Sequence, residues 1–140
     1  MKILLSIKPE YVSKIFDGTK LFEFRKSIFK DKSVKTVVVY ATRPVSMIVG
    51  EFDIDDIICG TPTAVWARTS FYSGITKIFF DEYFMNRDVA YAISIGAVRE
   101  YEQPLQPSAI FPDFVAPQSY LYINDQSPSE AWRGQMTLSF

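Results

Sequence analysis

The apolar residues of this 140-residue chain occur in short runs, each interrupted by Lys, Asp, Gly or Pro. No run approaches the roughly twenty apolar residues that a membrane-spanning helix needs. The first run, residues 1–7, stops at Lys8 before the core of a signal peptide can develop. We therefore expect a soluble, cytoplasmic protein without a membrane segment. Its secondary structure should consist of short strands and helices.

The N-terminal pattern predicts a strand, a helix and a second strand. The strand of residues 1–7 precedes Pro9, which suits the first turn of a helix, and Gly18 suits the left-handed position that ends one. Residues after Gly18 alternate between apolar and polar, as in a half-buried strand. Glu23 and Arg25 should therefore share one face of this strand.

The rest of the chain predicts more strands than helices. Gly50 is a candidate for a β-bulge or a barrel corner, because glycine inside a strand often marks one. The expected strands span residues 36–42, 48–58, 90–101 and 120–123, and the expected helices span 61–68 and 77–85.

These elements favour an α+β fold, a mixed β-barrel of about five or six strands with flanking helices, over a doubly wound fold. There is no internal repeat and no linker between two apolar regions. We expect one domain over residues 1–124 and a loosely held polar tail over residues 125–140.

The residue types restrict the possible chemistry. Histidine is absent and Cys59 is the only cysteine, which excludes a disulfide framework, common zinc clusters and triads that need an imidazole base. We expect no metal and no cofactor. Cys59 ends an apolar run, so we expect a small buried core residue there.

The charge is unevenly distributed along the chain. The net charge is -1, but residues 1–43 hold ten Lys or Arg against four Asp or Glu, a local charge of +6, and the remainder carries -7. Such a protein does not coat nucleic acid indiscriminately, because that mode needs many cations. A local basic face and a simple lysine-rich surface both remain open.

The segments Ser6-Ile7-Lys8-Pro9 and 15–25 resemble the ASCH family of PUA-like domains. The hallmark of that family, G-x-K-x-x-E-x-R, is filled by Gly18, Lys20, Glu23 and Arg25. Its position after a predicted helix and before a predicted strand adds weight to a short motif. The resemblance extends over roughly residues 3–123.

The resemblance implies a small β-barrel whose cleft is lined by the motif, related to domains that bind RNA or modified nucleotides. One branch resembles amidohydrolases of acylated cytidine nucleosides, and another is described as cleaving single-stranded RNA. In the amidohydrolase branch a threonine, the presumed nucleophile, stands where this chain has Glu23. A carboxylate cannot replace that threonine directly, although Thr19 could supply a hydroxyl.

The motif residues suit an anionic or nucleotide ligand. Lys20 in a glycine-led turn can present a mobile ammonium, and Arg25 offers a planar fork for a phosphate or a base edge. Glu23 can orient that guanidinium, accept a hydrogen bond from a base, or act as a general base. The alternative is a surface Glu–Arg pair with no function.

Further candidates lie at strand ends or in loops near the motif. Trp66 and Tyr40 could also stack on a base. The expected ligand-binding residues are Lys8, Lys20, Glu23, Arg25, Tyr40, Arg43 and Ser119, and Thr42, Gln118 and Tyr120 are secondary candidates.

Three functions remain open. The first is a module that binds RNA, a nucleotide or a modified nucleoside. The second is a small metal-independent hydrolase, a ribonuclease or nucleoside amidohydrolase, that uses Lys20 and Glu23 as catalytic residues. The third is a regulatory or phage-defence accessory protein that binds a metabolite. The sequence leaves the base, the choice of RNA over DNA and the oligomeric state open.

Overall fold

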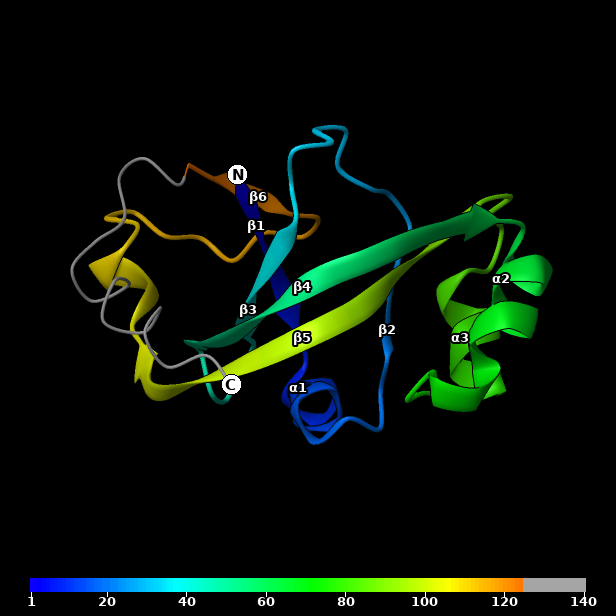
Figure 1. The fold of residues 1–140 in the computed structure, drawn as a ribbon, viewed down its shortest axis with the longest axis horizontal. Helices are drawn as coiled ribbons and strands as arrows, with labels where there is room; N and C mark the ends of the chain where they lie inside the picture. The colour runs from blue at the N-terminus through cyan, green and yellow to red at the C-terminus, as the bar shows by residue number, and fades with distance from the viewer. Residues whose placement is uncertain (125–140) are drawn as a thin grey trace.

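The fold is that of a computed structural model, which describes residues 1–124 (Figure 1). The expected tail, residues 125–140, lies outside this range. All of the expected strands and helices are present within it. In chain order the elements are β1 (Lys2–Ile7), α1 (Pro9–Asp17), β2 (Phe22–Arg25), β3 (Thr36–Ala41), β4 (Met47–Gly60), α2 (Pro62–Thr69), the 3-10 turn η1 (Ser70–Tyr72), α3 (Lys77–Tyr83), β5 (Ala90–Leu105), the 3-10 turn η2 (Pro107–Ala109) and β6 (Leu121–Ile123).

The strands form one six-stranded mixed sheet in the order β2-β5-β4-β3-β1-β6. The pair β1 and β3 is parallel, and the other neighbours are antiparallel. The α+β class is confirmed, but the expectation of a closed barrel is wrong. The four residues of β2 pair with β5 and the three residues of β6 pair with β1, so these short strands are the two edges of an open sheet within residues 1–124.

Gly50 marks an irregularity in the pairing of β4 with both of its neighbours, as the sequence predicted. A Cβ at this position would lie 2.5 Å from the carbonyl oxygen of Arg99 and 2.5 Å from Cζ of Phe16. No side chain fits there without a shift of the backbone of β5. Glycine is therefore required where α1 packs closely against the sheet.

Strand β3 is covered on both faces. Val37 and Val39 belong to one apolar cluster, and Val38 and Tyr40 belong to a second cluster on the other face. This arrangement agrees with the nearly continuous β-branched sequence of the strand.

A third apolar cluster, around Phe24, Phe80 and Phe84, lies at one end of the sheet. Helices α2 and α3 lie together at that end, beside the ends of β4 and β5 (Figure 1). They therefore cap one end of the sheet instead of flanking a barrel.

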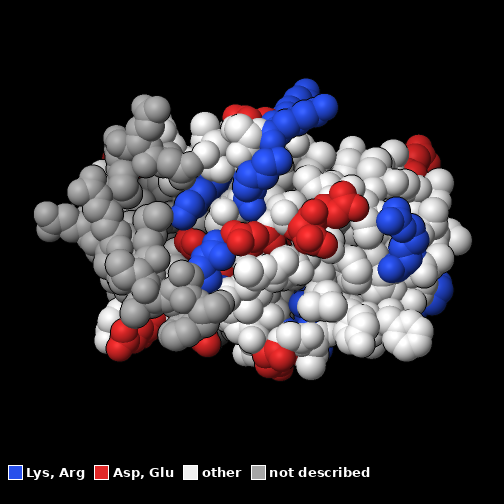
Figure 2. Space-filling model, in the orientation of Figure 1, with Lys and Arg blue, Asp and Glu red and all other residues white. Residues whose placement is uncertain are grey.

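One expectation about a single residue needs correction. Cys59 is exposed, because Ile58 takes the inward position of the alternating strand and turns its neighbour outward. The face of the molecule in Figure 2 carries both acidic and basic side chains. Across residues 1–124, no helix has the length and apolar character needed to cross a membrane.

Candidate functional site

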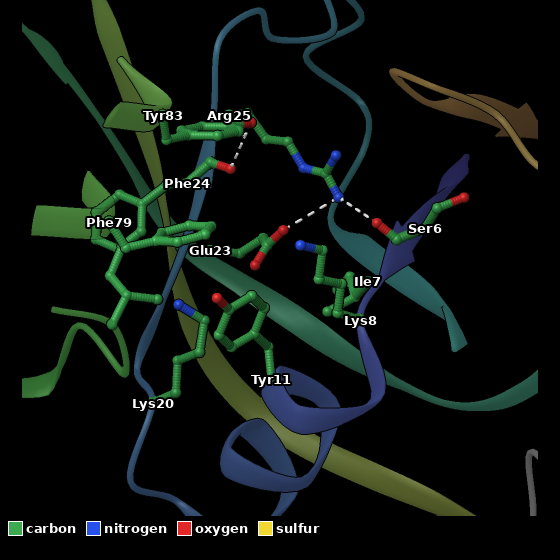
Figure 3. A pocket seen from close by; sticks show the side chains of 11 residues that line it. Ser6, Ile7, Lys8, Tyr11, Lys20, Glu23, Phe24, Arg25, Phe79 and Tyr83 are labelled. Carbon is green, nitrogen blue, oxygen red and sulfur yellow. Dashed lines mark hydrogen bonds and ion pairs between the residues drawn. The ribbon is translucent and has the colours of Figure 1, made fainter. Parts of the chain in front are cut away.

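A cavity of about 180 Å³ lies where the β1–α1 junction, β2 and α3 meet (Figure 3). It brings together the four expected residues Lys8, Lys20, Glu23 and Arg25. Four aromatic residues that the sequence did not single out as ligands, Tyr11, Phe24, Phe79 and Tyr83, line the same cavity. The remaining lining residues are Ser6, Ile7 and Ile75.

Local structure explains how the motif reaches this cavity. Gly18 ends α1 with φ of 86°, a left-handed value that favours glycine. The backbone N–H of Lys20 then donates to the carbonyl oxygen of Lys14 at 3.0 Å, which turns the chain toward β2. Glu23 and Arg25 are held in register on β2 by pairing with β5.

Lys20 is buried, with 1% of its surface exposed, so the expectation of a mobile ammonium is wrong. Its Nζ donates a hydrogen bond of 2.6 Å to the carbonyl oxygen of Ser73. The same Nζ lies 5.3 Å from the ring centre of Tyr11 and 4.9 Å from that of Phe24. Burial lowers the pKa of Lys20 from 10.5 to about 8, and the nearby Glu23 carboxylate opposes part of this shift.

Gly74 packs against the stem of Lys20. A Cβ at Gly74 would lie 2.5 Å from Cγ of Lys20 and 2.7 Å from its Cβ and Cδ. Gly74 also has φ of +71°, which L-residues with side chains seldom adopt. Two independent constraints therefore select glycine beside the buried lysine.

Arg25 is fixed by two contacts of its Nη2. This atom lies 3.0 Å from Oε2 of Glu23 and donates to the carbonyl oxygen of Ser6 at 2.9 Å. The Nε of Arg25 is buried and has no hydrogen-bond partner among residues 1–124. A buried donor without a partner is unusual, and a ligand acceptor would satisfy it.

Aromatic rings form one wall of the cavity. The rings of Phe79 and Tyr83 stack with an interplanar angle of 10° and a centroid separation of 6.3 Å. The hydroxyl of Tyr83 donates to the carbonyl oxygen of Phe24 at 3.3 Å, and Nζ of Lys8 lies 5.7 Å from the ring centre of Phe79. Figure 3 shows the Glu23 carboxylate directed into the space between these groups.

A second cavity, of about 360 Å³, adjoins the first through two shared residues, Arg25 and Tyr83. Its other lining residues are all polar or charged: Lys26, Ser27, Arg87, Gln118 and Ser119. The expected ligand-binding residue Ser119 therefore lies beside the motif, but in this neighbouring cavity.

Other candidate residues lie outside both cavities. Tyr40 is buried against Phe114, with ring centres 5.0 Å apart, and Trp66 packs on Phe80 at 4.8 Å. Arg43 is exposed in the turn after β3. The hydroxyl of Thr19 is exposed and donates to Oδ1 of Asp17 at 2.6 Å.

Helical spacing places Tyr11 on the apolar face of its predicted helix and Phe79 and Tyr83 on one face of theirs, which gives no reason to choose these residues over other aromatic residues. Their role at the site depends on α3 packing beside α1 and β2. Within residues 1–124 there is also no group of three or more His, Cys, Asp or Glu placed to hold a metal ion.

The six-stranded fold agrees with comparisons to known proteins. The chain belongs to the ASCH domain family, whose profile matches residues 5–102. It is 26% identical over 129 residues to the ASCH domain-containing ribonuclease of Zymomonas mobilis, a match that spans 88% of this chain and 84% of that protein.

Two further similarities extend this comparison. The chain is 31% identical over 103 residues to large ribosomal subunit protein uL22 of Ureaplasma parvum; the match spans 73% of this chain but 33% of that longer protein. The crystal structure of a tyrosine-to-phenylalanine mutant of ZmASCH from Zymomonas mobilis superposes with a TM-score of 0.84, at 23% identity, over 99% of each chain. That likeness supports the fold.

Proposed function

We propose that this ASCH domain binds a nucleotide of single-stranded RNA in the cavity lined by Lys20, Glu23 and Arg25. The observation that carries the proposal is the convergence of a buried lysine, a Glu–Arg pair and stacked aromatic rings on one small cavity. The similarity to a protein named as an ASCH domain-containing ribonuclease supports RNA as the ligand.

The chemistry of the cavity suits an unpaired base. Aromatic rings such as Tyr83 offer a stacking surface, Glu23 offers an acceptor for a base amino group, and the Nε of Arg25 offers a donor. The volume of about 180 Å³ is smaller than the roughly 300–1,000 Å³ of typical ligand sites. A cavity of this size holds one part of a nucleotide. A base must therefore unstack from its neighbours in the RNA before it can enter.

Binding should be local. The net charge is -1, and the surface in Figure 2 mixes both signs of charge. Few phosphates would be neutralised, so the affinity should fall only gradually with salt. A plot of the logarithm of the binding constant against the logarithm of the salt concentration should have a slope of roughly -0.7 for each phosphate contacted on a single strand.

The test is binding of ribonucleosides and short single-stranded RNAs to the wild type and to Arg25→Ala. The loss of the guanidinium should weaken binding by about 1–3 kcal/mol. Lys77→Ala is the matched control, because Lys77 is exposed on α3, pairs with Asp81 and lines neither cavity. Equal affinity of the wild type and Arg25→Ala would refute the proposed site.

A second candidate function is metal-independent hydrolysis, and one observation favours it. A pKa of about 8 means that Lys20 exchanges a proton readily near neutral pH, as a general acid or base should. In RNA cleavage the neutral amine would take the proton of a 2′-hydroxyl while its oxygen attacks phosphorus. The bond to the 5′-oxygen then breaks, and that oxygen takes a proton from water.

Within this candidate, Glu23 would act mainly by orienting Arg25, because its carboxylate is bound to that guanidinium. Nucleoside amide hydrolysis is the less favoured variant. The hydroxyl of Thr19 is bonded to Asp17 and lies outside the cavity, so it is not placed as a nucleophile.

The variants Glu23→Gln and Lys20→Met separate the two functions. Glu23→Gln keeps the shape and an acceptor, so a binding module should lose little affinity. In an enzyme, either variant should reduce turnover by about two orders of magnitude or more. The measurement is product formation from short RNAs and acylated nucleosides alongside the dissociation constant, and cleavage by both variants at the wild-type rate would exclude the catalytic role.

A further inference from the structure

The cavity beside the motif has the composition of an anion site. Three of its lining residues, Arg25, Lys26 and Arg87, are cationic, and no carboxylate lines it. Gln118 and Ser119 add an amide and a hydroxyl that can donate hydrogen bonds. In a protein with net charge -1, such a local excess of cations selects for a negatively charged group.

The walls of this cavity are held by contacts with the rest of the fold. Nζ of Lys26 lies 4.7 Å from the ring centre of Tyr83, whose hydroxyl is bonded to the backbone of β2. Next to Gln118 in the chain, the carbonyl oxygen of Pro117 accepts a hydrogen bond of 2.9 Å from the hydroxyl of Ser6. This bond ties the segment that carries Gln118 and Ser119 to the end of β1.

The two cavities are neighbours, because Arg25 and Tyr83 line both. The Nη2 of Arg25 is already engaged by Glu23 and Ser6, whereas its Nε has no partner among the residues that the structure describes. One ligand could therefore occupy both cavities. Its apolar, planar part would lie in the first, which we call the aromatic cavity, and its anionic part in the second, which we call the cationic cavity. The two volumes, about 180 and 360 Å³, together fall within the roughly 300–1,000 Å³ of typical ligand sites.

We propose that the cavity of Arg25, Lys26 and Arg87 binds the phosphodiester that joins the nucleotide in the aromatic cavity to its neighbour. This proposal rests on the proposed function, and it makes a dinucleotide the smallest complete ligand. A backbone phosphate matches the site because guanidinium groups bind its oxygens through paired N–H donors.

The experiment compares matched ligands that cannot be cleaved by attack of a 2′-hydroxyl. They are 2′-O-methyl ribonucleosides, the corresponding dinucleotides with a phosphodiester, and the same dinucleotides with an uncharged methylphosphonate linkage. Dissociation constants are measured for the wild type, Lys26→Ala, Arg87→Ala and the double variant. Arg68→Ala is the control, because Arg68 is exposed on α2 and lines neither cavity.

The wild type should bind the phosphodiester dinucleotide about tenfold or more tightly than the nucleoside, and the uncharged linkage should remove most of that gain. Arg87→Ala should reduce the gain by about three- to tenfold and leave nucleoside binding unchanged. Lys26→Ala, which also removes a contact with the Tyr83 ring, should reduce the gain by a similar factor. Arg68→Ala should retain the full gain. Inorganic phosphate should compete with the charged dinucleotide but not with the nucleoside.

Two failures are distinguishable. If the nucleoside binds in a manner that depends on Arg25 but the phosphodiester adds no affinity, or if the double variant keeps the full gain, the phosphate site is refuted and the proposed function stands. If neither the nucleosides nor the dinucleotides bind, both proposals are refuted.

Discussion

The ammonium of Lys20 is bonded to the carbonyl oxygen of Ser73, which lies 53 positions later in the chain, at 2.6 Å. The motif lysine, which precedes β2 in the chain, is thus held by the segment that joins α2 and α3. This contact and the packing of Gly74 on the lysine stem keep the charged group in place. The electrostatics of the site therefore depend on residues that the motif does not contain.

Gly74→Ala should destabilise the protein by about 2 kcal/mol or more. The new methyl group would clash with the Lys20 stem, and the positive φ would become strained. Chemical denaturation measures the effect. Gly60→Ala is the matched control, since a Cβ there makes only ordinary contacts of 3.7 and 3.8 Å, and equal stability of the two variants would contradict the packing described for Gly74.

Lys20→Met should reveal a pH-dependent contribution of Lys20 to stability. Burial lowers the pKa of this lysine from 10.5 to about 8, so between these values the unfolded chain binds more protons than the folded one. The wild type should therefore gain stability relative to Lys20→Met as the pH rises through this window, by about 3 kcal/mol in total. Parallel denaturation curves from pH 7 to 10 test this, and a difference that does not change with pH would contradict it.

Glu51→Ala should destabilise the fold by about 3 kcal/mol or more. Glu51 is buried on β4 and accepts from the hydroxyl of Tyr101 at 2.7 Å, from Nε of Arg99 at 2.9 Å and from Nζ of Lys2 at 3.3 Å. Removal of the carboxylate takes the acceptor from the buried hydroxyl of Tyr101 and one of two carboxylates from Arg99, which keeps its ion pair with Asp53.

Asp55→Ala, on the exposed part of the same strand, is the control for Glu51→Ala and should change the stability by no more than about 0.5 kcal/mol. Thermal or chemical unfolding of both variants gives the comparison. A similar, small effect of the two substitutions would show that the network contributes little.

Cys59 should react in the native state with one equivalent of a thiol reagent, because its side chain is exposed at the end of β4. The rate of this reaction in the folded protein should be close to the rate in the unfolded protein. Mass spectrometry of native and denatured samples provides the measurement. Protection by a factor of about one hundred in the native state would indicate that this end of β4 is covered.

Local patterns predicted the elements of this fold well. Pro9 and Gly18 bounded α1, the alternation around Glu23 set the face of β2, and Gly50 marked the irregular pairing of β4. Each of these features depends on neighbours in the sequence, and such neighbours determine backbone conformation directly.

Long-range packing explains what the sequence could not predict. The burial of Lys20 depends on Ser73 and Gly74, and the exposure of Cys59 depends on which side of β4 faces α2. The open sheet likewise depends on how far β2 and β6 extend and which strands they meet. A short motif contains none of this information: Lys20, Glu23 and Arg25 line one cavity, but the motif gave the wrong environment for its lysine.

The span between Lys20 and Ser73 also has a consequence for synthesis on the ribosome. Chains are synthesised from the N-terminus onward at roughly 5–20 residues per second. The complete motif therefore appears seconds before the carbonyl group that holds its lysine. Throughout that interval, the ammonium can remain hydrated and keep an ordinary proton affinity. A nascent chain truncated before Ser73 would carry every residue of G-x-K-x-x-E-x-R and still lack the carbonyl oxygen that holds its lysine, so the environment of this lysine is completed only by the second half of the polypeptide.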